Sequence, residues 1–183
     1  MLRKLLARLG RDAPPRRTYR QIVVQARQPA FYAGLGVPDT VSGRFDMIVL
    51  HAFLLFERLR RPEREAAADF AQEVFDEMFL DMDHNLREMG VSDVAVGKRV
   101  RRMSEVFYGR VAAYRAALDA GDDAALEDAF RRNIFAGKAP EGAPRALCLY
   151  VMEALELLRG IPEARLCRGE IAFPAPPPME EES

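Results

Sequence analysis

The sequence predicts an all-α protein with a single globular domain of about six or seven helices. Apolar residues recur at spacings of three and four through most of the chain, and no segment alternates like a β-strand for long. Glycines and prolines punctuate these periodic segments. The length of 183 residues suits one domain. We divide the chain into a basic amphipathic N-terminal segment (1–13), a helical domain (14–173) and a tail (174–183).

The N-terminal segment combines one apolar stripe with a strong excess of positive charge. The stripe consists of Leu2, Leu5, Leu6 and Leu9. Such a segment is typical of a short basic helix that binds an anionic membrane or a ribosome. We expect the contact to use Arg3, Lys4, Arg8, Arg11, Arg16 and Arg17. Two alternatives stay open: the leucines pack on the core, or the segment is a mitochondrial transit peptide.

Three further segments complete the first half of the domain. A helix is expected from Tyr19 to Ala30, with Pro29 kinking or ending it. A loop follows at 34–40, because two glycines and a proline disfavour helix there. Thr40 or Ser42 can cap the next helix. That helix is apolar nearly all round from 47 to 56, which indicates a central, buried position.

The second half of the domain contains two long helices and two shorter ones. The fourth helix carries a broad apolar face and ends near Gly90, and the fifth extends from Val96 to Gly121. Shorter helices follow at 126–134 and 147–158, the last one stopped by glycine and proline. From residue 174 the proline- and glutamate-rich tail cannot bury apolar surface, so we expect disorder.

Composition excludes several classes of function. The formal net charge of −1 gives no reason to expect specific DNA binding. The two cysteines form no CxxC pair, which favours two free thiols over a zinc site. No apolar run reaches the roughly 20 residues that span a bilayer. Segment 81–92 resembles a calcium loop only at its start, because Leu86 and Ser92 occupy the required glycine and glutamate positions. We therefore expect no metal, no cofactor and no catalytic residue.

Methionine and phenylalanine are concentrated on the fourth and fifth helices. Ordinary core packing explains such stripes, but an adaptable groove for an apolar client explains them equally well, since methionine repacks easily. The candidate groove residues are Phe75, Met78, Phe79, Met82, Met103 and Phe107. We also expect one ion-paired seam between helices, close to the loop that ends at Asp46. Its members would be Asp81, Asp83, Arg87, Arg44 and Arg110.

Several short segments together resemble the ubiquinol–cytochrome c chaperone family. They are Phe31-Tyr32, Val37-Pro38-Asp39-Thr40, Gly43-Arg44-Phe45-Asp46, Val49-Leu50-His51, the stretch DMDHNLREMGVSD at 81–93, and Phe107-Tyr108-Gly109-Arg110. The resemblance extends from about Tyr19 to Leu158, and it departs from the family at His84, where arginine is expected. Its polar motif residues are Arg44, Asp46, Asp81, Asp83, Asn85, Arg87, Glu88, Tyr108 and Arg110.

This resemblance implies a non-enzymatic chaperone that helps to assemble the cytochrome bc1 complex. It implies apocytochrome b or another bc1 subunit as client, with a ribosome, an anionic membrane and a small assembly partner protein as further partners. We expect a bacterial member at the cytoplasmic face of the inner membrane, the alternative being the matrix side of the mitochondrial inner membrane. Two other functions stay open: a generic helical adaptor without a bc1 client, and an enzyme or small-ligand binder with a pocket near His51 and Asp83.

Overall fold

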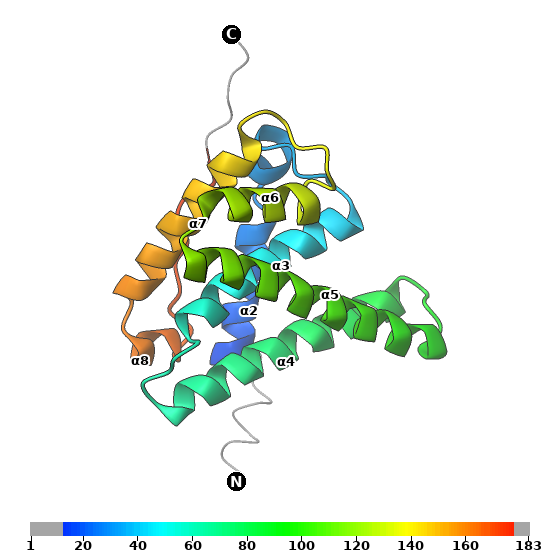
Figure 1. Ribbon diagram of the computed structural model, residues 1–183. Coiled ribbons are helices and arrows are strands. Elements are labelled where there is room, and N and C mark those ends of the chain that lie inside the picture. Colours follow the sequence, from blue (N-terminus) through cyan, green and yellow to red (C-terminus); the bar gives the residue numbers. More distant parts are fainter. Residues whose placement is uncertain (1–12, 178–183) are drawn as a thin grey trace.

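The computed structural model describes residues 13–177, and this part of the chain contains seven α-helices, one π-helical turn and no strand (Figure 1). The elements are α2 (Pro14–Ala26), η1 (Ala30–Gly34), α3 (Val41–Arg58), α4 (Glu65–Glu88), α5 (Asp93–Ala120), α6 (Asp123–Asn133), α7 (Ala143–Gly160) and α8 (Glu163–Leu166). The predicted all-α class is confirmed. The helix predicted for the first eleven residues lies outside the described residues.

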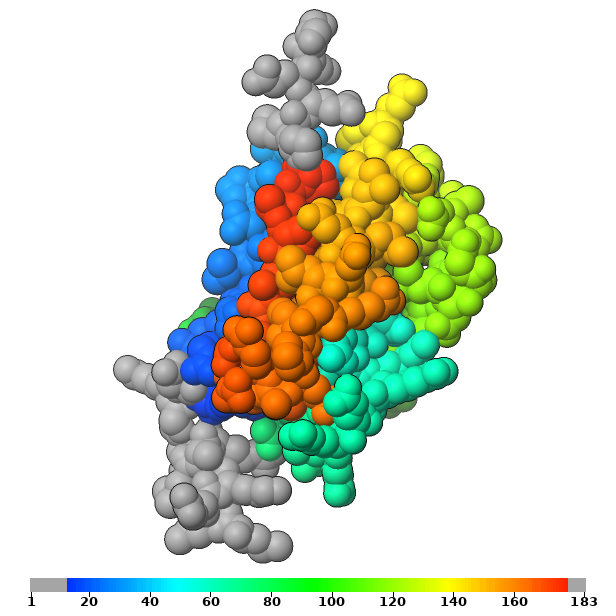
Figure 2. Space-filling model, turned by 90° about the vertical axis from the view of Figure 1, so that its left-hand side faces the viewer, coloured from blue at the N-terminus to red at the C-terminus, as the bar shows by residue number. Residues whose placement is uncertain are grey.

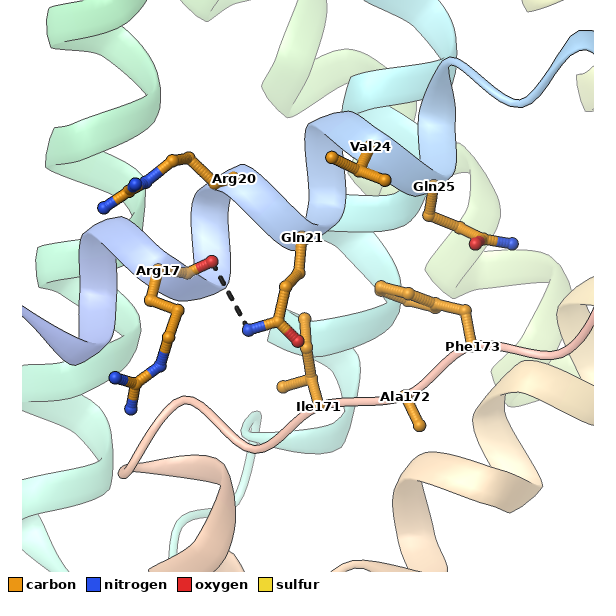
Figure 3. A pocket seen from close by; sticks show the side chains of 8 residues that line it. All are labelled: Arg17, Arg20, Gln21, Val24, Gln25, Ile171, Ala172 and Phe173. Atoms are coloured by element: carbon orange, nitrogen blue, oxygen red, sulfur yellow. Dashed lines mark hydrogen bonds between the residues drawn. The ribbon is translucent and has the colours of Figure 1, made fainter. Parts of the chain in front are cut away.

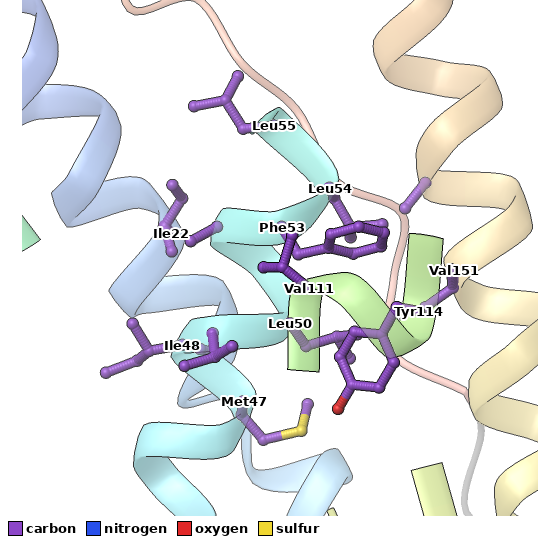
Figure 4. Packing of buried hydrophobic residues seen from close by; sticks show 14 of the residues in the cluster. Ile22, Met47, Ile48, Leu50, Phe53, Leu54, Leu55, Val111, Tyr114 and Val151 are labelled. Atoms are coloured by element: carbon purple, nitrogen blue, oxygen red, sulfur yellow. The ribbon is translucent and has the colours of Figure 1, made fainter. Parts of the chain in front are cut away.

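Helix α3 is the centre of the molecule. Every residue from Asp46 to Leu55 is buried, and α2, α4, α5 and α7 all pack against this helix. Figure 4 shows its side chains interdigitating with those of α2, α5 and α7, including Ile22, Tyr114 and Val151. A helix that is apolar on all sides is stable only when neighbours cover every face. The sequence prediction of a buried third helix is therefore confirmed.

The loop before α3 is held by the first turn of that helix. The Thr40 hydroxyl accepts a hydrogen bond from the Gly43 amide at 3.1 Å, which caps the helix. The backbone of Gly43 lies against the Pro38 carbonyl so closely that a Cβ atom would be 2.0 Å from its oxygen. Glycine at this position is thus a steric requirement, because no side chain fits between the loop and the helix.

Helix α2 ends earlier than the spacing of its apolar residues predicts. It stops at Ala26, and a separate π-helical turn begins at Ala30 after Pro29. Proline disfavours helical backbone at the residue before it, so a continuous helix to Ala30 is not formed. The apolar spacing continues across this break because Ala26 and Phe31 both face the core.

Helices α4 and α5 form a long hairpin whose outer end projects beyond the other helices (Figure 1). Gly90 has a φ of +77° and reverses the chain between them. Helix α2 packs across α4 on the inner side of the hairpin. The hairpin is therefore covered near the body and open to solvent toward its tip.

After α8 the chain makes a turn and then returns along α2 without regular secondary structure; we call residues 168–174 the strap. Figure 2 shows it in red between α2 in blue and α7 in orange. Gln21 and Gln25 donate hydrogen bonds of 2.9 Å to the carbonyls of Gly169 and Pro174. Pro174 is buried, so ordered contacts extend one residue past the predicted boundary at 173. Residues 178–183 lie outside the described part.

Candidate client-binding surface

An aromatic cluster at the junction of α3, α4 and α5 connects the core to the surface. The ring centroids of Phe75 and Phe79 are 4.6 Å apart, and those of Phe75 and Phe107 are 5.4 Å apart. Phe56 packs against Phe107 from α3 at 6.0 Å. Tyr108 lies 5.4 Å from Phe107 and is 57% exposed. The cluster thus begins in the core and ends at a solvent-exposed tyrosine.

The six predicted groove residues divide into two groups. Met78, Met82 and Phe107 are buried in the core, whereas Phe75, Phe79 and Met103 are part-buried and pack against it. The stripe on α4 and α5 is broad because α2 and α3 also cover it, and not only because a client must bind there. Around the aromatic cluster, Phe75 and Phe79 are part-buried and Tyr108 is exposed, and we call these three residues the aromatic patch; Met103 lies one turn from Phe107.

Tyr108 enters the candidate surface in a different role from the one predicted. The sequence placed it among the polar residues of the family motifs, yet its ring packs 5.9 Å from Phe75 and 5.4 Å from Phe107. No hydrogen bond of its hydroxyl occurs among the described residues. The signal that could have identified it is its position next to Phe107, at the edge of the apolar stripe of α5.

The motif residues Asp46 and Arg110 form an ion pair between α3 and α5. Their side chains are only 6% and 15% exposed, and the guanidinium contacts the carboxylate directly. Burial raises the pKa of Asp46 to about 6, although the neighbouring Arg110 charge acts in the opposite direction. The guanidinium carbon also lies 5.8 Å from the centre of the Phe45 ring. The pair fixes the angle between the central helix and the helix that carries Tyr108.

Asp81 forms the polar link between α4 and α2. Its carboxylate accepts a hydrogen bond from the Tyr19 hydroxyl at 2.8 Å and one from the Asn85 amide at 3.0 Å. Burial and the Asp81 charge both raise the pKa of Tyr19, so its hydroxyl stays a donor. The Tyr19–Asp81 contact is part-buried between α2 and α4, which gives Asp81 a structural role in this arrangement.

The single ion-paired seam predicted from the sequence is not formed, and this expectation is corrected. Arg44 pairs with Asp39 at 2.6 Å inside its own loop, Arg110 pairs with Asp46, and Arg87 pairs with Asp83 at 2.6 Å near the hairpin tip. No hydrogen bond or ion pair in residues 13–177 joins these three sets. Helix periodicity indicates which charges share a face, but partners across helices depend on packing.

The hairpin tip is rich in exposed charges. Arg87 also contacts Asp93 at the start of α5, and Glu88 pairs with His84 at 3.1 Å. These groups are solvated, so their pairing contributes little to stability. Arginine at the hairpin turn nevertheless ties the last turn of α4 to the first turn of α5.

The basic residues predicted to contact a membrane or ribosome lie partly outside the described residues. Arg3, Lys4, Arg8 and Arg11 belong to residues 1–12. Arg16 forms an ion pair of 3.0 Å with Glu77 on α4, and Arg17 donates to the Arg168 carbonyl of the strap. These two side chains therefore attach α2 to its neighbours in the folded protein.

His51 is the centre of a buried hydrogen-bond chain. Its Nδ1 lies 2.7 Å from the Met47 carbonyl and its Nε2 lies 2.8 Å from the Tyr150 hydroxyl. A carbonyl only accepts, so Nδ1 carries the proton and Nε2 accepts from Tyr150. Gln25 donates in turn to the Tyr150 oxygen at 3.0 Å. Burial lowers the pKa of His51 to about 4, which keeps the ring neutral.

The strap covers the solvent side of this hydrogen-bond chain. Gln21 and Gln25 point from α2 toward the strap, and Ile171 and Phe173 point back toward α2 (Figure 3). The Phe173 ring packs 5.3 Å from the His51 ring, and a hollow of about 340 Å³ remains at this surface. Asp83 pairs with Arg87 on α4 and does not line this hollow. The predicted pocket combining His51 and Asp83 is therefore not formed.

The remaining chemical candidates concern metals, thiols and membranes. Within the described residues, no group of three His, Cys, Asp or Glu side chains is placed to hold a metal ion. Cys148 and Cys167 are free thiols, as predicted, and burial raises the pKa of both. None of the helices in residues 13–177 is long and apolar enough to cross a membrane.

Comparison with known proteins identifies the family. The model of the ubiquinol–cytochrome c chaperone family matches residues 33–173, which extend from η1 to the strap. The chain belongs to this family. Two curated members are similar over most of the chain. Protein CBP3, mitochondrial, of Saccharomyces cerevisiae is 27% identical over 150 residues, which cover 80% of this chain and 44% of the yeast protein. This chain thus spans less than half of that relative.

The name of a second relative states the process in which that protein acts. Ubiquinol-cytochrome-c reductase complex assembly factor 1 of Xenopus laevis is 26% identical over 163 residues, covering 86% of this chain and 78% of the frog protein. The crystal structure of the Cbp3 homolog from Brucella abortus superimposes with a TM-score of 0.82 at 40% identity, covering 98% of this chain and all of that one. This chain therefore shares its helical fold, α2 included, with a bacterial protein.

Proposed function

We propose that the chain is a non-enzymatic assembly chaperone for the cytochrome bc1 complex, and that it binds newly made apocytochrome b at the membrane. Membership of the ubiquinol–cytochrome c chaperone family supports the process, as does similarity to a frog protein named as an assembly factor for this complex. The observation that carries the client-binding part is the aromatic patch, which lies where the α4–α5 hairpin meets α3.

The aromatic patch has the properties that reversible capture of an apolar segment requires. Accessible aromatic side chains, here Tyr108 with the part-buried Phe75 and Phe79, provide large contact area with few rotatable bonds. Burying a fully exposed ring in a complex contributes about 2 kcal/mol. Tyr108 can contribute up to that amount, and the part-buried Phe75 and Phe79 contribute less, which suits a contact that must be released. Apocytochrome b is a membrane protein, and its apolar segments need cover before insertion.

The site of action in this proposal is the cytoplasmic face of the inner membrane, or the matrix side if the protein is mitochondrial. The chaperone would sit peripherally, with its basic N-terminal segment directed at the anionic lipid surface or the ribosome. A small assembly partner protein would act with it.

Gene deletion followed by quantification of assembled bc1 complex tests the process. Complementation with Tyr108→Asp tests the patch, because Tyr108 is 57% exposed and its loss leaves the fold intact. The matched control is Leu149→Asp on α7, where the native side chain is 56% exposed. We expect assembled complex to fall at least several-fold with the first variant and to stay at the wild-type level with the second.

Photo-crosslinking tests the identity of the client independently of the role in bc1 assembly. A photoreactive amino acid at position 108 should crosslink to newly made cytochrome b, and the same group at position 149 should not. Normal bc1 levels in the deletion strain would overturn the assembly function. Reduced bc1 levels combined with equal crosslinking at both positions would overturn the patch as the client site.

A further inference from the structure

The projecting end of the α4–α5 hairpin carries two large, exposed apolar side chains. Met89, at the turn, is 56% exposed, and Val94, in the first turn of α5, is 77% exposed. We call these two residues the apolar tip. Single exposed apolar side chains are common on protein surfaces, so the apolar tip acquires a meaning only from the residues beside it.

Positive charge follows the apolar tip along α5. The basic ridge, as we name it, consists of Lys98, Arg99, Arg101 and Arg102, which are all exposed. At 3.6 residues per turn, Val94, Lys98 and Arg101 lie on the side of α5 that is opposite its buried residues. Arg102 lies beside them and Arg99 at the edge of this side. The outer face of α5 therefore begins with an apolar residue and continues with cations.

The basic ridge keeps its positive charge when the neighbouring acids are counted. Residues 94–105 contain four basic side chains and one acid, which is Glu105. The ion pairs near the tip are those of Asp83 and Asp93 with Arg87, of Glu88 with His84, and of Glu105 with Arg101. Lys98, Arg99 and Arg102 form no hydrogen bond or ion pair with any residue of the described range 13–177. These three cations are therefore available to an anionic partner.

An anionic lipid surface matches this combination of groups. Its headgroups attract lysine and arginine within a Debye length, and its interfacial layer accepts apolar side chains that project between the headgroups. The backbone of a nucleic acid would match the charge of the ridge only. The apolar tip next to the ridge thus favours lipid.

We propose that the apolar tip and the basic ridge dock on an anionic lipid surface, with the tip in the headgroup layer and the ridge against the lipid phosphates. This inference rests on the membrane location in the proposed function and assigns that contact to a surface of the folded domain. Tyr108 lies two turns beyond Arg101 on the same side of α5. Docking would therefore bring the aromatic patch to the lipid surface.

Vesicle co-sedimentation of the full-length protein tests the electrostatic contact. The vesicles contain equal parts of phosphatidylcholine and phosphatidylglycerol, with phosphatidylcholine alone as the neutral reference. Each cation near an anionic surface raises affinity about fivefold, so Lys98→Gln combined with Arg102→Gln should lower it about 25-fold at low salt. The matched control, Arg61→Gln with Arg64→Gln, removes the same charge from exposed residues just before α4. The control should change the affinity by less than about twofold.

Fluorescence tests the entry of the apolar tip into the lipid layer. The sequence contains no tryptophan, so one introduced indole reports on its own position. Val94→Trp places the indole in the tip, and Leu149→Trp on α7, where the native side chain is 56% exposed, is the control. With anionic vesicles that carry brominated acyl chains, we expect a blue shift and quenching at position 94 and no change at position 149.

Two results would overturn the proposal. The first is an undiminished affinity of the Lys98→Gln, Arg102→Gln variant for anionic vesicles. The second is a reduced affinity of that variant without a fluorescence change specific to position 94, which would assign the basic ridge to a soluble polyanion such as RNA. Both measurements use purified protein and lipid, so their failure is distinguishable from normal bc1 levels in the deletion strain.

Discussion

The buried chain through His51 and Tyr150 gives a quantitative test of how the core is held together. Tyr150→Phe removes one hydroxyl and keeps the ring, whose centroid lies 5.1 Å from that of Phe31. The change leaves His51 Nε2 buried without a donor. An unsatisfied buried group costs about 1–3 kcal/mol. In a chain of this length we expect the melting temperature to fall by about 5 °C.

A double-mutant cycle separates this hydrogen bond from ring packing. When His51 is already leucine, no acceptor remains for Tyr150 to leave unsatisfied. We therefore expect Tyr150→Phe to cost about 1–2 kcal/mol less in the His51→Leu background than in the wild type. The free energy of unfolding is measured by urea titration for the wild type, the two single variants and the double variant. Strict additivity of the two changes would refute the hydrogen bond as an energetic contact.

The pH dependence of stability provides an independent check. The pKa of His51 is about 4 in the folded protein and about 6.5 in an unfolded chain. The unfolded state binds the proton first, so the contribution of neutral His51 is complete above pH 6.5 and is lost as the pH falls toward 4. Between pH 7 and pH 5 the wild type should lose about 2 kcal/mol more than His51→Leu. Equal losses in the two proteins would contradict a buried neutral histidine.

Three further predictions concern other contacts. Gly43→Ala should destabilise the fold by about 3 kcal/mol, measured by urea unfolding, since its Cβ would lie 2.0 Å from the Pro38 carbonyl oxygen. Arg110→Ala should cost about 3 kcal/mol at pH 7 because it leaves Asp46 buried without its partner. Part of that loss should return at pH 5, where the raised pKa lets the carboxyl group protonate in the fold. Truncation after residue 168 should cost about 4 kcal/mol in the same assay, with removal of 178–183 as the matched control.

Helix periodicity was sufficient for most of the architecture. A stripe with a period of three to four identifies each long helix, and glycine or proline marks its ends. The exceptions are local: Pro29 divides a segment whose apolar spacing is continuous, and α8 is only four residues long, too short for a periodic pattern. Elements of one turn are fixed by their tertiary contacts, which the sequence does not display.

The candidate site could be predicted only in part, because burial depends on the number of neighbours that a helix has. The apolar stripe of α4 is the same whether α2 or a client covers it. Helix α2 covers part of it, and Met78 and Met82 are consequently core residues. Partners of charged groups are equally hidden, since Asp46 and Arg110 are separated by 64 residues in the sequence. The sequence indicates that charges beside apolar stripes need partners, but which residues pair is decided by how the helices pack.

The acidic face of α4 shows where the sequence carried more information than the apolar stripe alone. The periodicity that identifies Phe70 and Val74 as core residues also places Asp69, Glu73 and Asp76 together on a neighbouring face. What the spacing cannot supply is the position of α2, which brings Ala13 to the end of that face.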